Sequence, residues 1–323
     1  MTQARRMLGG IIAGLAGLAA LAAGPAHAQA AKAVAAPPAT VAREAAAASK
    51  PGPWPAGVPH LGASQILEKH IAARGGAAWK SVQALQLQGT IEAGRGDSVA
   101  RSNAIYEANR NLRKQVAGPV PAAEGSEASS GRAGPPAEVE LPFKLDVKRP
   151  HKSRLEIVFA GKTAWQAYDG QTGWKFRPFL NRTDVEPFTA EENRIEAGQD
   201  DLEGPLFGSA ARHTSITVEG VEKVDGRDAY RLRLVARDGS ARTVWVDTRS
   251  FLDVKVQGTS RRVDGTMRAV YVTQRDFRPV QGILVPFVAE TAVDGVAETH
   301  TLRVEKVSVN PALVDALFTK PSA

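Results

Sequence analysis

Asp-Gly dipeptides recur five times in the second half of this chain, at positions 169–170, 225–226, 238–239, 264–265 and 294–295. Most of them lie between short runs in which apolar and polar residues alternate. Asp-Gly adopts the positive φ angles that a tight hairpin turn needs, so each dipeptide marks a point where the chain folds back. The sequence therefore predicts an antiparallel meander. A curved sheet of this kind is typical of a container rather than of a catalytic scaffold.

The N-terminus carries an export signal. Arg5 and Arg6 precede an apolar run over residues 7–24, and Ala26-His27-Ala28 follows as an A-x-A cleavage site. This pattern predicts a secretory signal peptide, residues 1–28, cleaved after Ala28. An uncleaved membrane anchor is the alternative, but Gly and Ala dilute the run and the cleavage site follows it directly.

The chain contains no cysteine. It can therefore form no disulfide, carry no lipid on an N-terminal cysteine and use no thiol chemistry. An exported chain of this type is predicted to reside in the periplasm of a Gram-negative bacterium.

The net charge is moderately basic. The formal value is +7 for the whole chain, and removal of Arg5 and Arg6 with the signal peptide leaves +5. Lys and Arg are mostly interleaved with Asp and Glu, which is typical of solvated sheet faces rather than of a nucleic-acid interface. We therefore expect no nucleic-acid partner. A weak attraction to anionic membranes stays open, although the chain has no polybasic cluster.

Composition divides the mature chain into a tether and one domain. Residues 29–60 are rich in Ala and Pro and have few large apolar side chains, so we expect a disordered tether. Residues 61–320 fit one large β-rich domain. Within it, about 118–136 form a Pro, Gly, Ser and Ala stretch without periodicity, which predicts a mobile insertion.

Three helices are expected. Apolar residues between Ile66 and Ile71 recur at helical spacing, and Gly75-Gly76 follow as a C-terminal cap. Thr189 and Glu192 form a T-x-x-E capping box for a short helix that ends near residue 197. Asn310 is predicted as the N-cap of a last helix, with Pro311 at its first position and an apolar stripe to Phe318.

The strands are predicted from alternation of apolar and polar residues. In the first of them Leu85, Leu87 and Ile91 share one face. A second strand is expected near 101–109. The other strands are centred on Leu145, Ile157, Trp165, Trp174, Val218, Leu232, Val244, Val254, Ala269, Ile283 and Leu302. Polar residues occupy most alternate positions, so one face of the sheet is expected to be apolar and the other solvated.

The order of elements resembles that of the LolA-like periplasmic lipoprotein-carrier superfamily. The resemblance covers about residues 61–320 and rests on structural motifs. These are Tyr168-Asp169-Gly170 with Gly173-Trp174, Glu203-Gly204-Pro205-Leu206, Val221-Glu222-Lys223-Val224-Asp225-Gly226 with Tyr230, Trp245-Val246-Asp247, and Gly282-Ile283 with Val285-Pro286. It implies a mainly β fold with a few helices (α+β), in which a strongly curved antiparallel sheet forms an unclosed half-barrel covered by helices.

The resemblance also implies a function. It indicates a non-enzymatic carrier or binding protein that shields the acyl chains of a lipidated protein, or of another amphiphilic lipid, in an apolar cavity. Shielding one chain of roughly sixteen carbons is worth about 12 kcal/mol, which a shallow patch cannot supply. An envelope sensor that acts through an inner- or outer-membrane partner protein is the alternative. A hydrolase ranks third, because nucleophile motifs such as G-x-S-x-G are missing.

Seven residues are predicted to line the cavity. The strand residues Leu87 and Ile91 are joined by aromatic side chains near the Tyr168 turn and the helical excursion. The full set is Leu87, Ile91, Trp165, Trp174, Phe176, Phe179 and Phe207. The alternative interpretation is ordinary core packing, since large rings dominate burial in most cores. Of the aromatic residues, Trp174 and Phe179 are the strongest cavity candidates.

Other chemistries receive little support. Histidine spacing and the lack of Cys predict no metal site, and we expect no cofactor and no catalytic residue. The acidic patch between Glu191 and Glu203 lacks a calcium-loop motif, so a solvated helix face is favoured. Arg261 and Arg262 could contact lipid headgroups or simply form a charged turn.

Overall fold

The computed structural model describes residues 54–93, 139–178, 184–263, 265–296 and 299–321. The predicted signal peptide, the tether up to residue 53 and the insertion at 118–136 lie outside these ranges. So do the strand expected near 101–109 and the side chain of Phe179.

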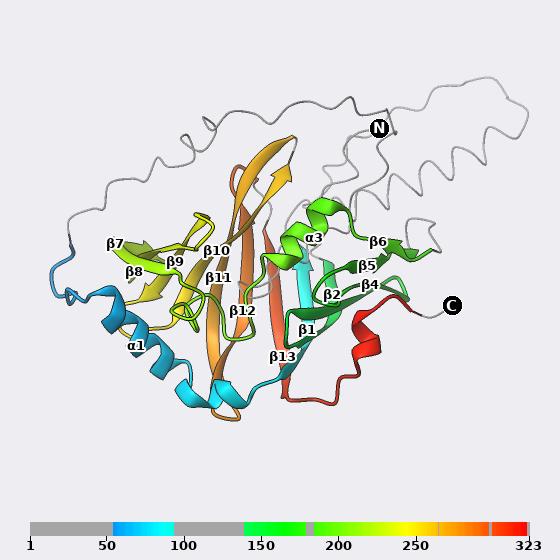
Figure 1. Cartoon of the computed structure of the whole chain (residues 1–323), viewed down its shortest axis with the longest axis horizontal. Helices are drawn as coiled ribbons and strands as arrows, with labels where there is room; N and C mark the ends of the chain where they lie inside the picture. The colour runs from blue at the N-terminus through cyan, green and yellow to red at the C-terminus, as the bar shows by residue number, and fades with distance from the viewer. Residues whose placement is uncertain (1–53, 94–138, 179–183, 264, 297–298, 322–323) are drawn as a thin grey trace, which may run out of the picture.

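A single antiparallel sheet of thirteen strands forms the described domain (Figure 1). The first group of strands is β1 (Ala84–Ala93), β2 (Val139–Lys148), β3 (Lys152–Phe159), β4 (Lys162–Tyr168), β5 (Gly173–Phe176) and β6 (Glu186–Pro187). The second is β7 (Ser215–Val224), β8 (Arg227–Val235), β9 (Ala241–Asp247), β10 (Asp253–Val263), β11 (Thr266–Val280), β12 (Ile283–Val293) and β13 (His300–Val309). The fold is therefore mainly β, as predicted.

All five Asp-Gly dipeptides lie at turns between consecutive strands. The glycine has a positive φ in each of them, between 68° and 100°. A positive φ is the conformation that a tight hairpin turn requires. The predicted meander is confirmed by these turns.

The helices are short. The described ones are α1 (Ala63–Ala73), the 3-10 helix η2 (Gly76–Ser81), α3 (Ala190–Ala197) and the 3-10 helix η4 (Asp315–Phe318). The predicted capping box of α3 is confirmed, because the Glu192 amide donates to Thr189 Oγ1 at 3.2 Å and the Thr189 amide donates to Glu192 at 2.6 Å. Within the described ranges, no helix has the length and apolarity needed to cross a membrane.

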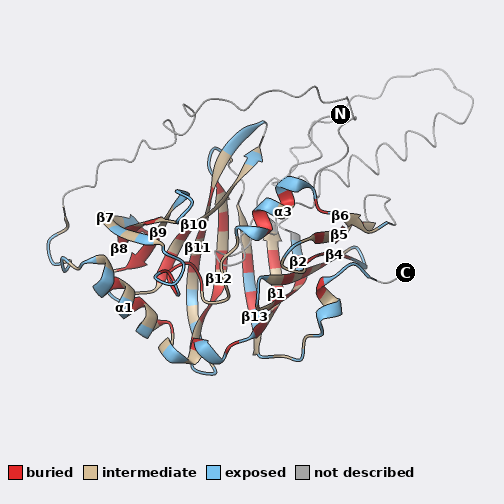
Figure 2. Ribbon diagram, in the orientation of Figure 1, coloured by how far each residue is buried: buried red, intermediate tan, exposed pale blue. Residues whose placement is uncertain are grey.

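The register gives the sheet two chemically distinct faces. Leu87 of β1 is opposite Leu145 of β2, which is opposite Leu155 of β3, and all three are at most 2% exposed. We call the face that they share the apolar face. Its buried cluster continues through Ile157, Leu232, Val244, Val256, Val272, Val285, Leu302 and Val304. Figure 2 shows the buried residues concentrated along the strands, whereas the tips of β10 and β11 are exposed.

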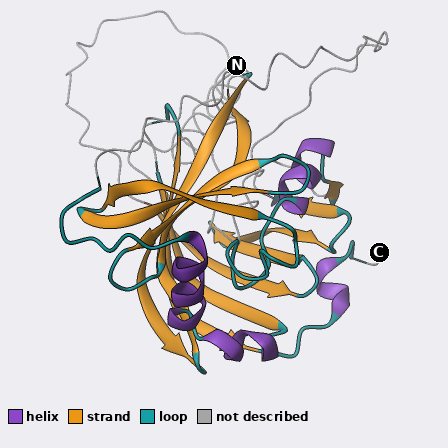
Figure 3. Ribbon diagram, turned by 60° about the vertical axis from the view of Figure 1, so that its left-hand side comes forward, coloured by secondary structure: helices purple, strands orange, loops and turns teal. Residues whose placement is uncertain are grey.

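The two groups of strands meet where β1 pairs with β13, and we call this central pair of strands the seam. The order runs β6-β5-β4-β3-β2-β1-β13-β12-β11-β10-β9-β8-β7, so β1 pairs with β13, and β6 and β7 are the edges. The connection between the edges, residues 188–214, includes α3 and must travel from one end of the sheet to the other. Figure 3 shows helices and loops packed beside the strands.

Asn310 corrects the prediction for the C-terminus. Instead of capping a helix, Asn310 has a φ of 53° and extends the seam beyond β13. Its side-chain oxygen accepts from the amides of Gln83 and Ala84, at 2.7 and 3.2 Å. The predicted last helix is only the single turn η4. The Asn310 side chain bonds to backbone amides at the start of β1 instead of capping a helix.

The boundary between tether and domain also differs from the prediction. Residues 54–60, expected to belong to the disordered tether, pack on the folded domain. The Trp54 ring stacks on His60 with ring centroids 4.2 Å apart, and the Tyr230 hydroxyl donates to the Pro59 carbonyl at 3.0 Å. One large ring and one buried hydroxyl offset the ordering of residues 54–60, which lie within the stretch predicted as tether.

Gly89 on β1 provides a test of the seam. A Cβ at this position would lie 1.9 Å from the carbonyl oxygen of Arg303 on β13. The replacement Gly89→Ala should therefore push the two central strands apart and lower the free energy of unfolding by about 2 kcal/mol or more. Gly62→Ala is the control, because its nearest neighbour would be 3.8 Å away. Urea denaturation of both variants measures the difference; equal losses would contradict the close approach.

Candidate functional site

Three of the seven predicted cavity residues lie in one cluster. Leu87 and Ile91 project from the apolar face of β1, and each is 2% exposed. Phe207 reaches the same cluster from the connection between α3 and β7. The structure joins these three in one buried cluster, where they pack against other apolar side chains.

The aromatic residues of β4 and β5 lie on the other side of the sheet. Trp165 is opposite Glu156 of β3, whereas its neighbour Ala164 is opposite Ile157 of the apolar face. Because Trp165 pairs with Phe176, these two rings share a face and stack with centroids 6.2 Å apart. Side chains alternate between faces along a strand, so both rings point away from Leu87.

Trp174 also belongs to this opposite face. It is opposite Ala167, two residues along β4 from Trp165. The ammonium of Lys320 lies 5.5 Å from the Trp174 ring, and the guanidinium of Arg154 lies 4.5 Å from the Trp165 ring. The C-terminal residues therefore pack over these aromatic side chains. The structure does not bring Trp165, Trp174 and Phe176 together with Leu87 and Ile91.

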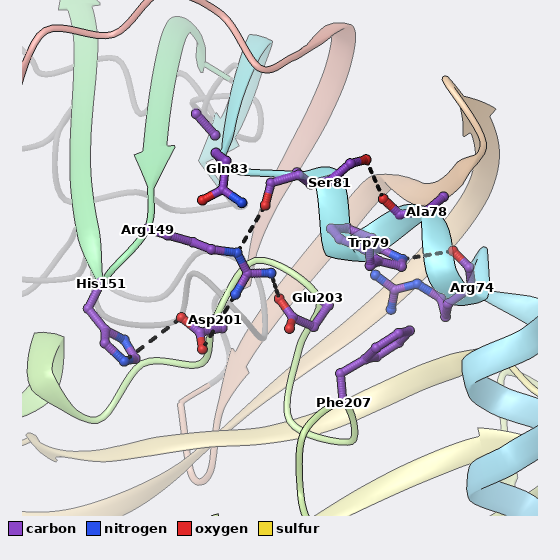
Figure 4. Close-up of polar contacts among 12 residues, drawn as sticks. Arg74, Ala78, Trp79, Ser81, Gln83, Arg149, His151, Asp201, Glu203 and Phe207 are labelled. Carbon is purple, nitrogen blue, oxygen red and sulfur yellow. Dashed lines mark hydrogen bonds and ion pairs between the residues drawn. The ribbon is translucent and has the colours of Figure 1, made fainter. Parts of the chain in front are cut away.

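A short stretch of the edge-to-edge connection lies against the apolar cluster. We call residues 201–207 the closing segment. Leu206 is fully buried in the cluster, and Phe207 is 7% exposed. The Phe207 ring lies 6.0 Å from Trp79 of η2 and 5.7 Å from His70 of α1. Figure 4 shows Phe207 projecting below Trp79 and Arg74.

Arg149 holds the closing segment from the end of β2 (Figure 4). Its Nε donates to the Val82 carbonyl at 2.9 Å, and its Nη2 donates to Glu203 at 2.5 Å. Asp201 lies 3.7 Å from Nη1 of the same guanidinium. All three charged side chains are partly exposed, between 14% and 26%, so water can compete for these contacts.

Arg212 fastens the same segment from its other end. Its Nη2 donates to the carbonyls of Pro205 and Phe207, at 2.8 and 2.6 Å. These bonds satisfy backbone oxygens beside the buried side chains of Leu206 and Phe207. The closing segment is thus held by two guanidinium groups and by the burial of two apolar side chains.

Near the closing segment, Arg74 forms a more deeply buried anchor. It follows α1, and its Nη1 contacts Asp253 at 2.5 Å, with both side chains at most 5% exposed. Its Nε donates to the Leu284 carbonyl at 3.1 Å, which ties α1 to β10 and β12. Burial lowers the pKa of the adjacent His70, whose Nδ1 lies 2.9 Å from the Phe251 carbonyl oxygen. His70 is a packed core residue here.

The acidic patch near α3 is only partly solvated, because Glu192 and Glu196 are buried while Glu191 is exposed, which corrects the expectation of a solvated helix face. Glu192 contacts Lys175 of β5 at 2.5 Å, with side-chain exposures of 6% and 3%. Asp200 pairs with Arg242 of β9, and its side chain is 7% exposed. Burial raises the pKa of Asp200, while Arg242 opposes that rise. These carboxylates dock α3 and the residues after it onto the sheet.

Glu196 is the least compensated of these acids. It is 3% exposed, and among the described residues it accepts only a long bond of 3.4 Å from Ser153, while its Oε1 has no hydrogen-bond partner there. Burial raises its pKa to about 7, and the negative charge of Glu192 adds to that rise. A pocket of about 30 Å³ adjoins it, lined also by His151, Lys152, Ser153, Gln199, Asp200 and Asp201. This volume suits water or a small ion, not an acyl chain.

Metal binding has no support in the described ranges. There, no three His, Asp or Glu side chains are grouped so that they could hold a metal ion. The chain has no Cys. The charged groups described above pair with one another and organise the connection between the sheet edges.

Several solved structures resemble this one. A LolA superfamily protein from Nitrosomonas europaea matches with a TM-score of 0.47 at 16% identity, over 80% of this chain and 98% of that chain. A domain described as an outer membrane lipoprotein-sorting protein, from Vibrio parahaemolyticus, matches with a TM-score of 0.44 at 12% identity, over 78% and 94%. A DUF1329 family protein from Desulfovibrio piger matches with a TM-score of 0.43 at 11% identity, over 79% and 96%.

No protein-family model matches the sequence, and no curated protein matches it. The similarity to the LolA superfamily stated from sequence motifs is thus also found among solved structures, at low identity and low TM-score. At these values the matches do not transfer a ligand, a partner or a site residue to this chain.

Glu196 makes stability depend on pH. Its folded-state pKa of about 7 exceeds the ordinary value of 4.5, so its protonated form favours folding. Its contribution is full below about pH 4.5 and is lost as the pH rises through 7, by about 3 kcal/mol at most. Glu196→Gln should remove this loss and raise the melting temperature at pH 8.5 relative to the native chain, but not at pH 4.5. Thermal unfolding of the native chain and the variant at both pH values tests this. If the two proteins differ in melting temperature by the same amount at pH 4.5 and at pH 8.5, the prediction is wrong.

Proposed function

We propose that this protein is a non-enzymatic periplasmic carrier or binding protein, in which the apolar face forms the lining of a half-barrel for acyl chains. The ligand would be a lipidated protein or another amphiphilic lipid. The observation that carries the proposal is the closing segment: Leu206 and Phe207 occupy a place on the apolar face that an acyl chain could take instead.

The energies of such an exchange favour binding. Burial of Leu206 and Phe207 stabilises the closed form by roughly 3 to 6 kcal/mol in total. An acyl chain of roughly sixteen carbons gains about 12 kcal/mol when it leaves water completely. Even incomplete burial of such a chain therefore offsets displacement of the two side chains.

The polar contacts of the closing segment support reversible opening. Arg149 and its two carboxylate partners are partly exposed, and ion pairs in such positions contribute about 1 kcal/mol or less each. By contrast, the ion pair between Arg74 and Asp253 is buried and holds α1 in place. The proposal is that residues 201–207 move while α1 and the sheet stay fixed.

The same contacts support a binding role over a catalytic one. The guanidinium groups that touch the closing segment donate to carboxylates and to backbone carbonyls of the chain itself. Their arrangement positions a loop. The face beneath it consists of aliphatic and aromatic side chains, which attract apolar ligands without reacting with them.

A neutral hydrophobic dye tests this proposal. The full chain is expected to bind 1-N-phenylnaphthylamine with increased fluorescence, and monomyristoylglycerol should displace the dye. Arg149→Gln removes the bonds to Val82 and Glu203, so the closed form loses about 1.4 kcal/mol and the dye should bind about tenfold more tightly.

Arg278→Gln is the matched control, because Arg278 is exposed and contacts Asp276 and the Phe287 ring rather than the closing segment. Its dye affinity should equal that of the native chain. If neither the native chain nor Arg149→Gln binds the dye or the monoacylglycerol, the proposed function is wrong. If all three proteins bind equally well, the apolar face is used but Arg149 does not restrain access to it.

A further inference from the structure

The hairpin formed by β10 and β11 carries two arginines at directly opposed positions. Arg261 of β10 pairs with Arg268 of β11 in the register of the sheet. Side chains at opposed positions point to the same face, and like charges in this arrangement destabilise a hairpin. Figure 1 shows both strands rising beyond their neighbours, so the pair lies near a projecting end of the sheet.

These arginines continue the apolar face. Val270 and Val272 follow Arg268 at two-residue intervals along β11, and they are 1% and 0% exposed. Since alternate residues of a strand share a face, the guanidinium groups extend the row of buried valines toward the hairpin tip. A molecule lying along the apolar face would meet positive charge at this end.

Neither arginine is fully compensated. The Nε atoms of Arg261 and Arg268 are both buried, and neither has a hydrogen-bond partner among the described residues. Burial alone lowers the pKa of Arg261 to about 10. A buried cationic donor without a partner costs free energy, and an anion bound between the two side chains would recover it.

Two neighbouring elements, α3 and the turn after β12, lie close to the arginine pair. Arg194 of α3 donates from Nη2 to the Ser260 carbonyl at 3.4 Å, which brings a third guanidinium to the adjoining residue. A Cβ placed on Gly295, in the turn after β12, would lie 2.6 Å from Arg268 Nη1, so the glycine leaves room for that guanidinium. Arg262 differs, because it pairs with Met267 and donates to the Gly265 carbonyl within the turn.

We propose that Arg261 and Arg268 bind the phosphate group of an anionic amphiphile whose acyl chain lies along the apolar face. A tetrahedral phosphate directs oxygens toward donors on two sides, whereas a carboxylate is satisfied by one bidentate arginine. This inference rests on the proposed function and adds the class of ligand: a phosphate-bearing lipid rather than a neutral one.

Two ligands with the same acyl chain test the assignment. The full chain is titrated with 1-myristoyl-lysophosphatidylglycerol and with monomyristoylglycerol, each displacing 1-N-phenylnaphthylamine below its critical micelle concentration. The native chain is expected to bind the lysophospholipid at least tenfold more tightly. The double variant Arg261→Gln with Arg268→Gln should bind both ligands within about twofold of each other and keep its affinity for monomyristoylglycerol.

The control variant is Arg227→Gln with Arg249→Gln. It removes the same charge from two exposed arginines, one at the start of β8 and one in the turn between β9 and β10, and it should keep the preference for phosphate. Circular dichroism melting checks that each variant is folded. The single variant Arg268→Gln should still lose most of the preference if the double variant is unstable.

The outcomes separate this inference from the proposed function. A preference for the lysophospholipid that survives in the arginine variants would overturn the phosphate site while leaving the carrier function intact. Calorimetry with inorganic phosphate alone should show binding at least a hundredfold weaker than the lysophospholipid. Equal affinity would overturn the assignment to a lipid and indicate free phosphate. If neither amphiphile displaces the dye, the proposed function itself fails.

Discussion

The path of the chain between the two edges of the sheet constrains most of the structure. Residues 188–214 connect β6 at one edge of the thirteen-stranded sheet with β7 at the other. Across a flat sheet, adjacent strands are about 4.8 Å apart, so the edges would be separated by nearly 60 Å. The connection must therefore lie along the sheet, and its apolar residues Leu206 and Phe207 find their burial on the apolar face. The closing segment follows from this topology.

Charge and apolarity are divided along this connection. The residues that fasten it to the rest of the chain are Arg149, Arg212 and Arg242, which contact Glu203, backbone carbonyls and Asp200 respectively. The part that covers the sheet is apolar. Guanidinium groups suit the fastening role because one side chain can donate to several oxygens at once. In the proposed opening, these polar bonds would be exchanged for bonds to water, and an apolar ligand would replace the two buried side chains.

Local signals in the sequence predicted the elements well. The Asp-Gly turns and the Thr189–Glu192 capping box depend only on neighbours in the chain, and both are present in the structure. The faces of β4 were harder to predict, because every residue from Ala164 to Tyr168 is buried and alternation therefore carries no information. The C-terminal residues cover the side of Trp165, which nothing near Trp165 in sequence indicates. Contacts such as Arg149 with Glu203 depend on the path of a distant connection, so they were not foreseen.

The seam between β1 and β13 has a consequence for how this chain acquires its structure. Within each half, strands pair with their neighbours in sequence, most of them through short turns, but the two halves meet only when β1 pairs with β13, as Leu85 does with Val309. Loop closure over such a separation is slow. The centre of the sheet therefore forms only after β13 is available, and until then the chain presents two incomplete sheets with unpaired inner edges. Pairing of β1 with β13 thus completes the sheet by joining two parts that fold from separate regions of the chain.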